Sequence, residues 1–356
     1  MTVKYLIWYG TNYMTKVNAY NGFDPLIEVW LGAVYPVDFY YDFESEVRDA
    51  LTKITEMTMQ DLAKISKLLE SKNIKVQRPT FTNNRNDYIG NNSQLIKPPI
   101  MPRDTDLSLG NKFYHLRSDY KVDPWAQQIS DMINNGVDVQ IASTGTDLSC
   151  LCPPSIVRCG RDLYIDIDSH SHVMPQVSLT FTEWAKHYRV HLVSTGGHSD
   201  SVFCPVTEGL IVTTHWLDEY SKTFPDWEVF KMPLEQNHIA DVEQNWWVPD
   251  AQISNNSLFA KHIEQRALDW IGNYQETQFS VNMLVIDEKT VLAVNQNPLL
   301  TEFLINKGIE VIVADFRCKG FWDGGMHCLT CDISRLGGIK DYFPNRPDSN
   351  YLDWIA

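Results

Sequence analysis

The sequence predicts an α/β fold in which one supersecondary unit, two short strands followed by a helix and a returning strand, recurs about five times. Two observations predict the repeat: hairpin-like strand pairs occur at intervals along the chain, and three helices end in the same way before the next strand. Units that each bury one face against the next copy can close into a ring, which leaves no exposed sheet edge. We therefore expect one domain over residues 1–356.

The first copy is divided between the two ends of the chain. Residues 26–31 form an apolar strand, residues 44–71 carry an apolar stripe at helical spacing, and residues 74–77 continue as a strand. The apolar positions of the helix are Val47, Leu51, Ile54, Leu62, Ile65 and Leu69. We expect the C-terminal strand to complete this copy, and the polar residues 81–97 to form a surface loop.

The other four copies each begin with a strand pair around a short turn. The expected pairs are 103–109 with 112–116, 155–159 with 163–167, 201–206 with 209–214, and 281–286 with 290–295. Turns such as Gly110-Asn111 and Gly160-Arg161 are typical of hairpins. Helices are expected at about 124–135, 179–187, 217–224 and 298–307. Residues 235–279 fit no copy, and we interpret them as an insertion or lid.

The helix ends favour true repetition. Pro124 and Pro298 lie in the first turn of their helices, where proline is accepted, and Gly136 and Gly308 follow the last turn. Similar segments leave three helices: Asn-Ile-Lys-Val at 73–76, Gly-Val-Asp-Val at 136–139 and Gly-Ile-Glu-Val at 308–311. The alternative is coincidence, because helix–glycine–strand junctions are common in α/β proteins.

Composition limits the classes of function. The chain is 44% hydrophobic, so it can bury a large core. Its formal charge is −15. This charge argues against a nucleic-acid or anionic membrane surface, because both need clustered basic residues, and it permits a cationic substrate. Seven cysteines without a secretory signal indicate reduced thiols and a cytoplasmic protein. No stretch reaches the ~18–20 apolar residues of a membrane span.

The segment 323–332 contains the strongest candidate for catalysis. Cys328 lies between the paired glycines Gly324-Gly325 and Thr330, just after an apolar strand-like run. Glycines let the backbone turn and let a substrate approach it closely, so this thiol is a candidate nucleophile. The alternative is that Cys328 is a small buried hydrophobe, as free cysteines often are.

Three further motifs lie in the strands and turns of the expected hairpins. They are Met-Pro-Arg-Asp at 101–104, Cys-Gly-Arg-Asp at 159–162 and Gly-Gly-His-Ser-Asp at 196–200. His198 and Asp200 are two residues apart on an expected strand, so we expect their side chains to share a face. Histidine can transfer a proton near neutral pH. Asp104 and Asp162 each follow an arginine, and the alternative for both is a surface ion pair.

A metal site is the rival interpretation of Cys328 and Cys331. It is weak, because no second CxxC motif stands at zinc-finger spacing and positions i and i+3 of a strand face opposite sides. The chain also lacks the glycine-rich and P-loop motifs of nucleotide binding. The sequence therefore predicts no cofactor and no metal.

At these motifs the sequence resembles the amidinotransferases of the guanidino-group-modifying (pentein) superfamily, above all the arginine:glycine amidinotransferases. The resemblance extends over most of the chain, from Phe23 to Asp332. It is carried by the motifs at 101–104, 160–162 and 198–200, by 280–284 with 287–289, and by 324–328. It implies a five-bladed α/β propeller of ββαβ units with a central active site, and a possible homodimer.

The resemblance also implies roles for the motif residues. Cys328 would attack the guanidinium carbon of arginine and form a covalent amidino-enzyme with release of ornithine, and an amine acceptor would then take the amidino group. His198 would move the protons and Asp162 would orient His198. Asp104 and Asp200 would hold the guanidinium. The further positions implied in substrate binding are Arg103, Gly197, Ser280 and His327. A nearby His198 cation and a cationic substrate would both favour the thiolate.

The sequence departs from the family at the donor's tail. The family has an arginine that grips the donor carboxylate, but residues 213–218 contain none, and Lys222 is the nearest cation. Gly197 stands where the closest relatives of this family carry a bulkier residue, and the region 110–160 is much shorter than in the arginine:glycine amidinotransferases. The sequence therefore does not identify the acceptor amine. Two alternatives remain: a guanidine-group hydrolase such as an arginine or agmatine deiminase, and a non-catalytic arginine-binding protein.

Overall fold

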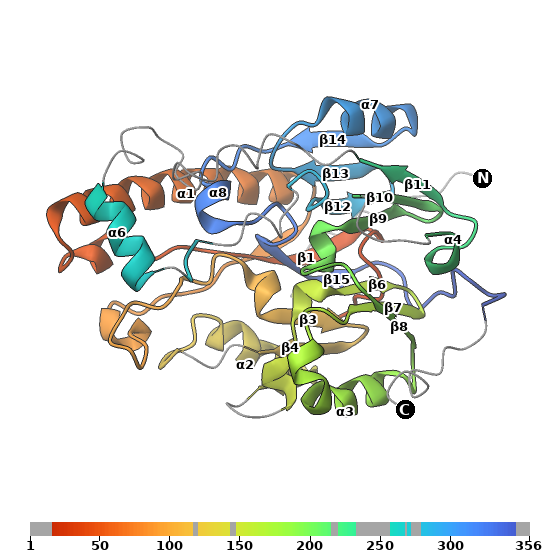
Figure 1. Cartoon of the computed structure of the whole chain (residues 1–356), viewed down its shortest axis with the longest axis horizontal. Helices are drawn as coiled ribbons and strands as arrows, with labels where there is room; N and C mark the ends of the chain where they lie inside the picture. Colours follow the sequence, from red (N-terminus) through yellow and green to blue (C-terminus); the bar gives the residue numbers. More distant parts are fainter. Residues whose placement is uncertain are drawn as a thin grey trace.

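The computed structural model describes residues 16–116, 120–142, 147–214, 220–232, 257–267, 269–271 and 279–346. Within these residues, five three-stranded sheets are arranged around a common centre, with the longer helices on the outside (Figure 1). In every sheet the middle strand pairs antiparallel with one neighbour and parallel with the other. The predicted repeat of strand pair, helix and returning strand is therefore confirmed.

The first sheet joins the two ends of the chain, as predicted. Strand β1 (Leu26–Leu31) pairs antiparallel with β15 (Thr330–Arg335) and parallel with β2 (Lys75–Gln77). Helix α1 (Ser45–Ser71) connects β1 to β2, and its predicted apolar stripe is buried. Because β15 follows Cys328 directly, closing the ring brings this cysteine to the centre of the fold.

The other four sheets follow in chain order. The second has β3 (Asp106–Leu109), β4 (Lys112–His115), α2 (Ala126–Asn134) and β5 (Asp138–Ile141). The third has β6 (Ile156–Cys159), β7 (Asp162–Asp166), α3 (Met174–Trp184) and β8 (Arg189–Val193). The fourth has β9 (Phe203–Thr207), β10 (Leu210–Thr213), α4 (Tyr220–Thr223) and β11 (Glu228–Lys231). The fifth has β12 (Leu284–Asp287), β13 (Thr290–Ala293), α7 (Pro298–Asn306) and β14 (Glu310–Val313).

Three helices end with the same hydrogen-bonded turn. After α1, α2 and α7 the chain passes through a left-handed residue, and the next N–H donates to a carbonyl five residues earlier. The left-handed residues are Asn73, Gly136 and Gly308, with φ of 62°, 78° and 77°. The bonds are Ile74 to Leu69 (3.2 Å), Val137 to Met132 (3.0 Å) and Ile309 to Leu304 (2.9 Å). The shared geometry supports repetition rather than coincidence.

The structure corrects two details of the predicted elements. Helix α3 begins at Met174, five residues before the expected 179, because Pro175 lies in its first turn and starts the helix there. The strand pairs begin later than expected, because short 3-10 turns precede three of them: η3 (Pro102–Asp104), η5 (Pro153–Ser155) and η7 (Ser199–Ser201). His198 and Asp200 therefore do not lie on a strand, and that prediction is wrong.

Most of the predicted insertion at 235–279 lies outside the described residues, as do residues 217–219 of the expected helix at 217–224. Within that insertion, α6 (Ser257–Arg266) packs against α1 and buries Phe259 and Ile263. The short helix α8 (Lys319–Trp322) lies between β14 and the Cys328 segment. None of the helices in the described ranges is long and apolar enough to span a membrane.

Candidate active site

Cys328 is held in the turn between α8 and β15, and only 2% of its surface is exposed. Asn282, from the turn before β12, holds it twice: its Nδ2 donates to the Cys328 Sγ at 3.0 Å, and its Oδ1 accepts the Cys328 N–H at 3.1 Å. The sulfur therefore has a fixed position. Asn282 belongs to the 280–284 motif, but the sequence analysis assigned no role to it. The signal that could have found it is its side-chain amide, which can both donate and accept a hydrogen bond.

The paired glycines before Cys328 lie in close contact with Met101 and Asn282. The sequence analysis had expected them to leave room for a substrate. A Cβ at Gly324 would lie 2.4 Å from the Met101 side chain, and one at Gly325 would lie 2.4 Å from the Asn282 carbonyl oxygen. Only glycine leaves room for these contacts. The glycines thus serve to pack the Cys328 turn against the turns before β3 and β12.

Asp200 lies next to the sulfur. Its carboxylate is 5% exposed, and its Oδ2 lies 3.8 Å from the Cys328 Sγ and 2.7 Å from the His327 Nδ1. Burial would raise the pKa of Asp200, but the hydrogen bond from His327 and the charges of His198 and Arg103 outweigh it and lower the pKa. Asp200 is therefore an anion beside the thiol.

His327 supports Asp200 as a neutral donor. Burial and the nearby Arg103 guanidinium lower its pKa, although Asp200 opposes them. The neutral ring donates its Nδ1–H to the Asp200 carboxylate. The His327 ring contacts Asp200 and stays partly exposed, so its implied contact with a substrate stays a prediction.

His198 directly precedes η7 and is a cation at neutral pH. Burial would lower its pKa, but a hydrogen bond with Cys152 and the charges of Cys152, Asp104 and Asp200 outweigh it and raise the pKa to about 10. Asp104, at the end of η3, is half-buried. Because Asp104 and Asp200 act on the pKa values of both His198 and Cys328, these four predicted residues share one site.

The Cys328 thiol is neutral in this site. Burial, Asp200 and Asp104 raise its pKa well above the ordinary value, and the Asn282 hydrogen bond opposes them only in part. The prediction that the His198 cation favours a thiolate is therefore wrong for the unliganded protein, because two carboxylates lie close to the sulfur. A cation bound between these carboxylates would reverse their effect.

Asp162 does not reach His198, which corrects the predicted role. Its Oδ1 accepts hydrogen bonds from His191 (2.6 Å) and Arg346 (2.9 Å), and its Oδ2 accepts one from Arg189 (2.7 Å). The reason is geometric: the site residues precede the first strand of a pair, whereas Asp162 follows the turn between β6 and β7. Strand β6 separates the two places by about 10 Å or more.

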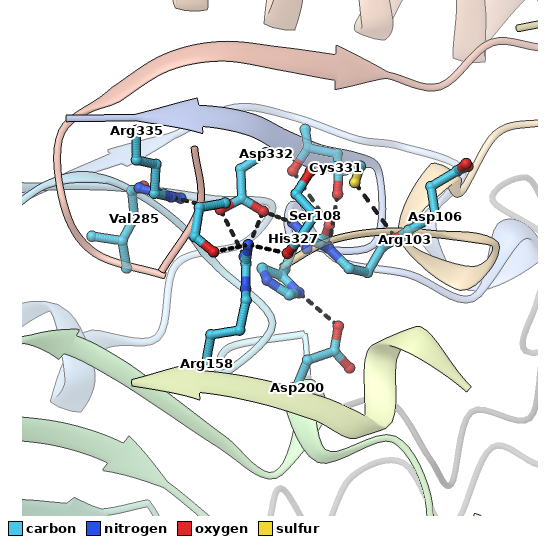
Figure 2. Close-up of polar contacts among 12 residues, drawn as sticks. Arg103, Asp106, Ser108, Arg158, Asp200, Val285, His327, Cys331, Asp332 and Arg335 are labelled. Carbon is cyan, nitrogen blue, oxygen red and sulfur yellow. Dashed lines mark hydrogen bonds and ion pairs between the residues drawn. The ribbon is translucent and has the colours of Figure 1, made fainter. Parts of the chain in front are cut away.

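Arg103 also lies elsewhere than predicted, in a buried ion cluster around Asp332 (Figure 2). Its Nη2 donates to Asp332 Oδ1 at 2.6 Å, and its Nε donates to the Thr330 carbonyl. Arg158 and Arg335 donate to the same carboxylate at 2.6–2.7 Å. One carboxylate thus binds three guanidinium groups. The positive charge of one of them, Arg103, helps to lower the pKa of Asp200.

The remaining predicted positions have structural partners. The Gly197 carbonyl accepts hydrogen bonds from Ser155 (3.2 Å) and Ser169 (2.9 Å), which hold the loop that carries His198. Ser280 is 3% exposed, and its hydroxyl accepts a long hydrogen bond from Asn295 at 3.5 Å. Contacts of Gly197 and Ser280 with a substrate therefore stay predictions.

Known proteins resemble this chain over different lengths. The mitochondrial glycine amidinotransferase of Gallus gallus is 25% identical over 208 residues, which cover 54% of this chain and 40% of that protein. The L-arginine:L-lysine amidinotransferase of Pseudomonas savastanoi pv. phaseolicola is 20% identical over 325 residues and 81% of each chain. The chain thus matches less than half the length of the vertebrate relative. No protein-family model matches the chain.

Solved structures share the fold. SxtG, an amidinotransferase of the saxitoxin pathway from Microseira wollei, has a TM-score of 0.65 at 17% identity and covers 92% of this chain and 99% of that chain. The inosamine-phosphate amidinotransferase StrB1 of Streptomyces griseus has a TM-score of 0.63 at 16% identity, with the same coverage. A dimethylarginine dimethylaminohydrolase has 0.52 at 11% identity and covers 86% of this chain and 99% of its own.

The chain has the fold of the guanidino-group-modifying, or pentein, proteins, as predicted. Within that group, the predicted resemblance to amidinotransferases is confirmed, and the curated relatives are enzymes.

Proposed function

We propose that the protein transfers the amidino group of L-arginine, or of a related guanidino donor, to an amine through a covalent intermediate on Cys328. The observation that carries the proposal is a buried thiol 3.8 Å from an ionised carboxylate, Asp200, with Asp104 and the His198 cation close by. A planar cation that stays protonated at ordinary pH, as a guanidinium does, suits two carboxylates.

Donor binding would prepare the nucleophile. In the unliganded site, Asp200 and Asp104 raise the pKa of the neutral Cys328 thiol. A guanidinium held by these two carboxylates would oppose their effect and lower the pKa of Cys328, and the thiol would lose its proton to solvent. The nucleophile would thus form only when a donor is bound.

The first half of the reaction forms the amidino-enzyme. The Cys328 thiolate attacks the guanidinium carbon, a C–S bond forms, and the C–N bond to the side chain of the donor breaks. The His198 imidazolium gives its proton to the leaving nitrogen, so ornithine departs as a neutral amine and takes up a further proton in water. His198 is left neutral.

The second half regenerates the enzyme. The neutral His198 takes a proton from the acceptor amine, whose nitrogen attacks the amidino carbon. The C–S bond then breaks and restores the Cys328 thiolate, which is protonated again when the product leaves. In both halves His198 carries the proton. The leaving group is ornithine in the first half and the Cys328 sulfur in the second, so a single site serves donor and acceptor in turn.

The test is an incubation of the protein with arginine and a panel of amines, followed by mass spectrometry. We expect repeated turnover to ornithine only with an amine, no more than one equivalent of ornithine per enzyme without one, and one amine to gain one amidino group. Cys328→Ala should abolish turnover and retain arginine binding in calorimetry, and Cys331→Ala, a buried cysteine on β15, is the matched control. Full activity of the Cys328→Ala protein would contradict the proposal.

The two alternatives give other products. A hydrolase would release ammonia and a ureido product without any amine, and a non-catalytic binding protein would bind arginine without turnover. The curated amidinotransferases favour transfer, and the polar, ionised site favours catalysis over binding alone.

Donor choice is open because the arginine expected to grip the donor carboxylate is absent from residues 213–218. Lys222, on α4, is exposed. A comparison of arginine with agmatine, which lacks the carboxylate, measures how much that group contributes to kcat/KM.

A further inference from the structure

Cys152 lies where Asp162 was expected, beside His198. It directly precedes η5, the turn that leads into β6, and its side chain is hydrogen-bonded to His198. The Ser155 hydroxyl also lies near the sulfur, 3.3 Å from the Cys152 Sγ. A sulfur with two polar side chains beside it differs from the buried cysteines of the core, such as Cys331, whose Sγ lies against a backbone carbonyl.

The backbone of Cys152 is fixed independently of His198. Its N–H donates to the His170 Nε2 at 3.1 Å, and the His170 Nδ1 donates to the Asp166 carbonyl at 2.7 Å. These two contacts define the tautomer of His170, because one ring nitrogen must accept and the other must donate. Burial lowers the pKa of His170, so the ring stays neutral and keeps this arrangement.

The loop of His198 is tied to the same turn. The Ser155 hydroxyl lies 3.2 Å from the Gly197 carbonyl and 2.7 Å from the Ser169 hydroxyl, and the Ser169 hydroxyl donates to Gly197 at 2.9 Å. Cys152 and His198 are therefore connected through side chains and through backbone. The turn before β6 and the loop before η7 form one rigid unit.

We propose that Cys152 is the positioning residue of His198: its sulfur lies beside the imidazole, is hydrogen-bonded to it and fixes the orientation of the ring. The proposal rests on the proposed function, in which His198 protonates the leaving nitrogen. Asp104 and Asp200 also surround His198, but that function assigns them to the guanidinium. Cys152 is thus the partner that substrate binding leaves in place.

A sulfur partner has consequences that a carboxylate would not have. A thiol is a weaker hydrogen-bond partner of an imidazole than a carboxylate is. Serine keeps a hydrogen bond at this position and stays uncharged. Aspartate keeps the hydrogen bond and adds a negative charge. The series Cys152→Asp, Cys152→Ser and Cys152→Ala therefore separates charge from hydrogen bonding.

The first measurement is the pH dependence of ornithine release in the wild type and these variants. We expect Cys152→Ala to lower kcat by about 10²-fold, with little change in KM for arginine, and to move the alkaline limb of the profile to lower pH. Cys152→Asp should restore most of kcat, and Cys152→Ser should be intermediate. Cys150→Ala, two residues away and also half-buried, is the matched control.

The second measurement does not depend on turnover. The titration of the His198 ring in the unliganded protein can be followed by NMR, with the signal assigned through His198→Asn. We expect the midpoint to fall by about one pH unit or more in Cys152→Ala and to stay unchanged in Cys150→Ala. An unchanged midpoint together with an unchanged pH profile would overturn the proposal. If the wild type forms no ornithine, the proposed function fails, and the titration still decides the role of Cys152.

Discussion

Two buried aspartate–histidine pairs in this protein have nearly the same geometry and different surroundings. In one, the Asp162 Oδ1 lies 2.6 Å from the His191 Nε2; in the other, the Asp200 Oδ2 lies 2.7 Å from the His327 Nδ1. Both carboxylates are less than a tenth exposed, and both histidines have a lowered pKa, with burial as its largest cause. The pair alone therefore does not indicate what an aspartate does.

The charges around each pair distinguish them. Asp162 binds the guanidinium groups of Arg189 and Arg346, and Asp341 binds Arg189 and Arg161, so both anions have guanidinium partners. This cluster connects β7 and β8 to the C-terminal segment.

The Asp200 cluster is different, because its carboxylates act on a thiol. Asp200 and Asp104 raise the pKa of Cys328, and the cations His198 and Arg103 lower the pKa of Asp200. The comparison teaches that carboxylates acting on a buried thiol are a better sign of a cation site than an aspartate–histidine contact.

Removing the charge of Asp200 gives the largest expected effect. Asp200→Asn keeps the shape of the side chain but removes one of the two carboxylates for the guanidinium, so we expect kcat/KM for arginine to fall by about 10³-fold, or about 4 kcal/mol. The melting temperature should change little, because the amide oxygen of the substituted side chain can still accept the hydrogen bond from the His327 Nδ1. Steady-state kinetics and calorimetry measure both. Unchanged kcat/KM in a folded Asp200→Asn protein would contradict this assignment.

Asp162→Asn should give the opposite pattern, with a loss of stability of about 3 kcal/mol, because two buried arginines lose their shared anion. The activity of the molecules that remain folded should stay close to that of the wild type, since Asp162 does not contact His198. Urea unfolding and kinetics at low temperature test this. A folded but inactive Asp162→Asn protein would restore the role that the sequence predicted.

The sequence predicted the fold well because the repeat leaves local signals. The left-handed residues Asn73, Gly136 and Gly308 each follow a helix, and all three have the predicted geometry. The start of α3 was missed although Pro175 carries the same signal as Pro124 and Pro298. Local rules therefore predict an element wherever a turn residue enforces one backbone conformation.

The structure brings Cys328, His198, Asp200 and Asp104 near one another, and it places Asp162 elsewhere, although the resemblance implied that Asp162 orients His198. The site residues lie in the turns that precede a strand pair, and not in the turns between its two strands. Cys152 was overlooked because a sulfur partner for histidine has no distinctive sequence pattern, and the contact is made between two separate copies of the repeat.

The smallest expected effect is the loss in acid of the stability that the Asp162 cluster contributes. Burial would raise the pKa of Asp162, but His191 and Arg189 outweigh it and lower the pKa below its unfolded value, which is about 3.9. The stabilisation is therefore fully present above that value and is lost as the pH falls through the lower, folded pKa. The difference in unfolding free energy between the wild type and Asp162→Asn should stay constant from pH 7 to about pH 5 and narrow below about pH 4. Urea titrations across this range measure it, and a difference that widens in acid would show that the arginines, rather than the Asp162 charge, set the stability of the cluster.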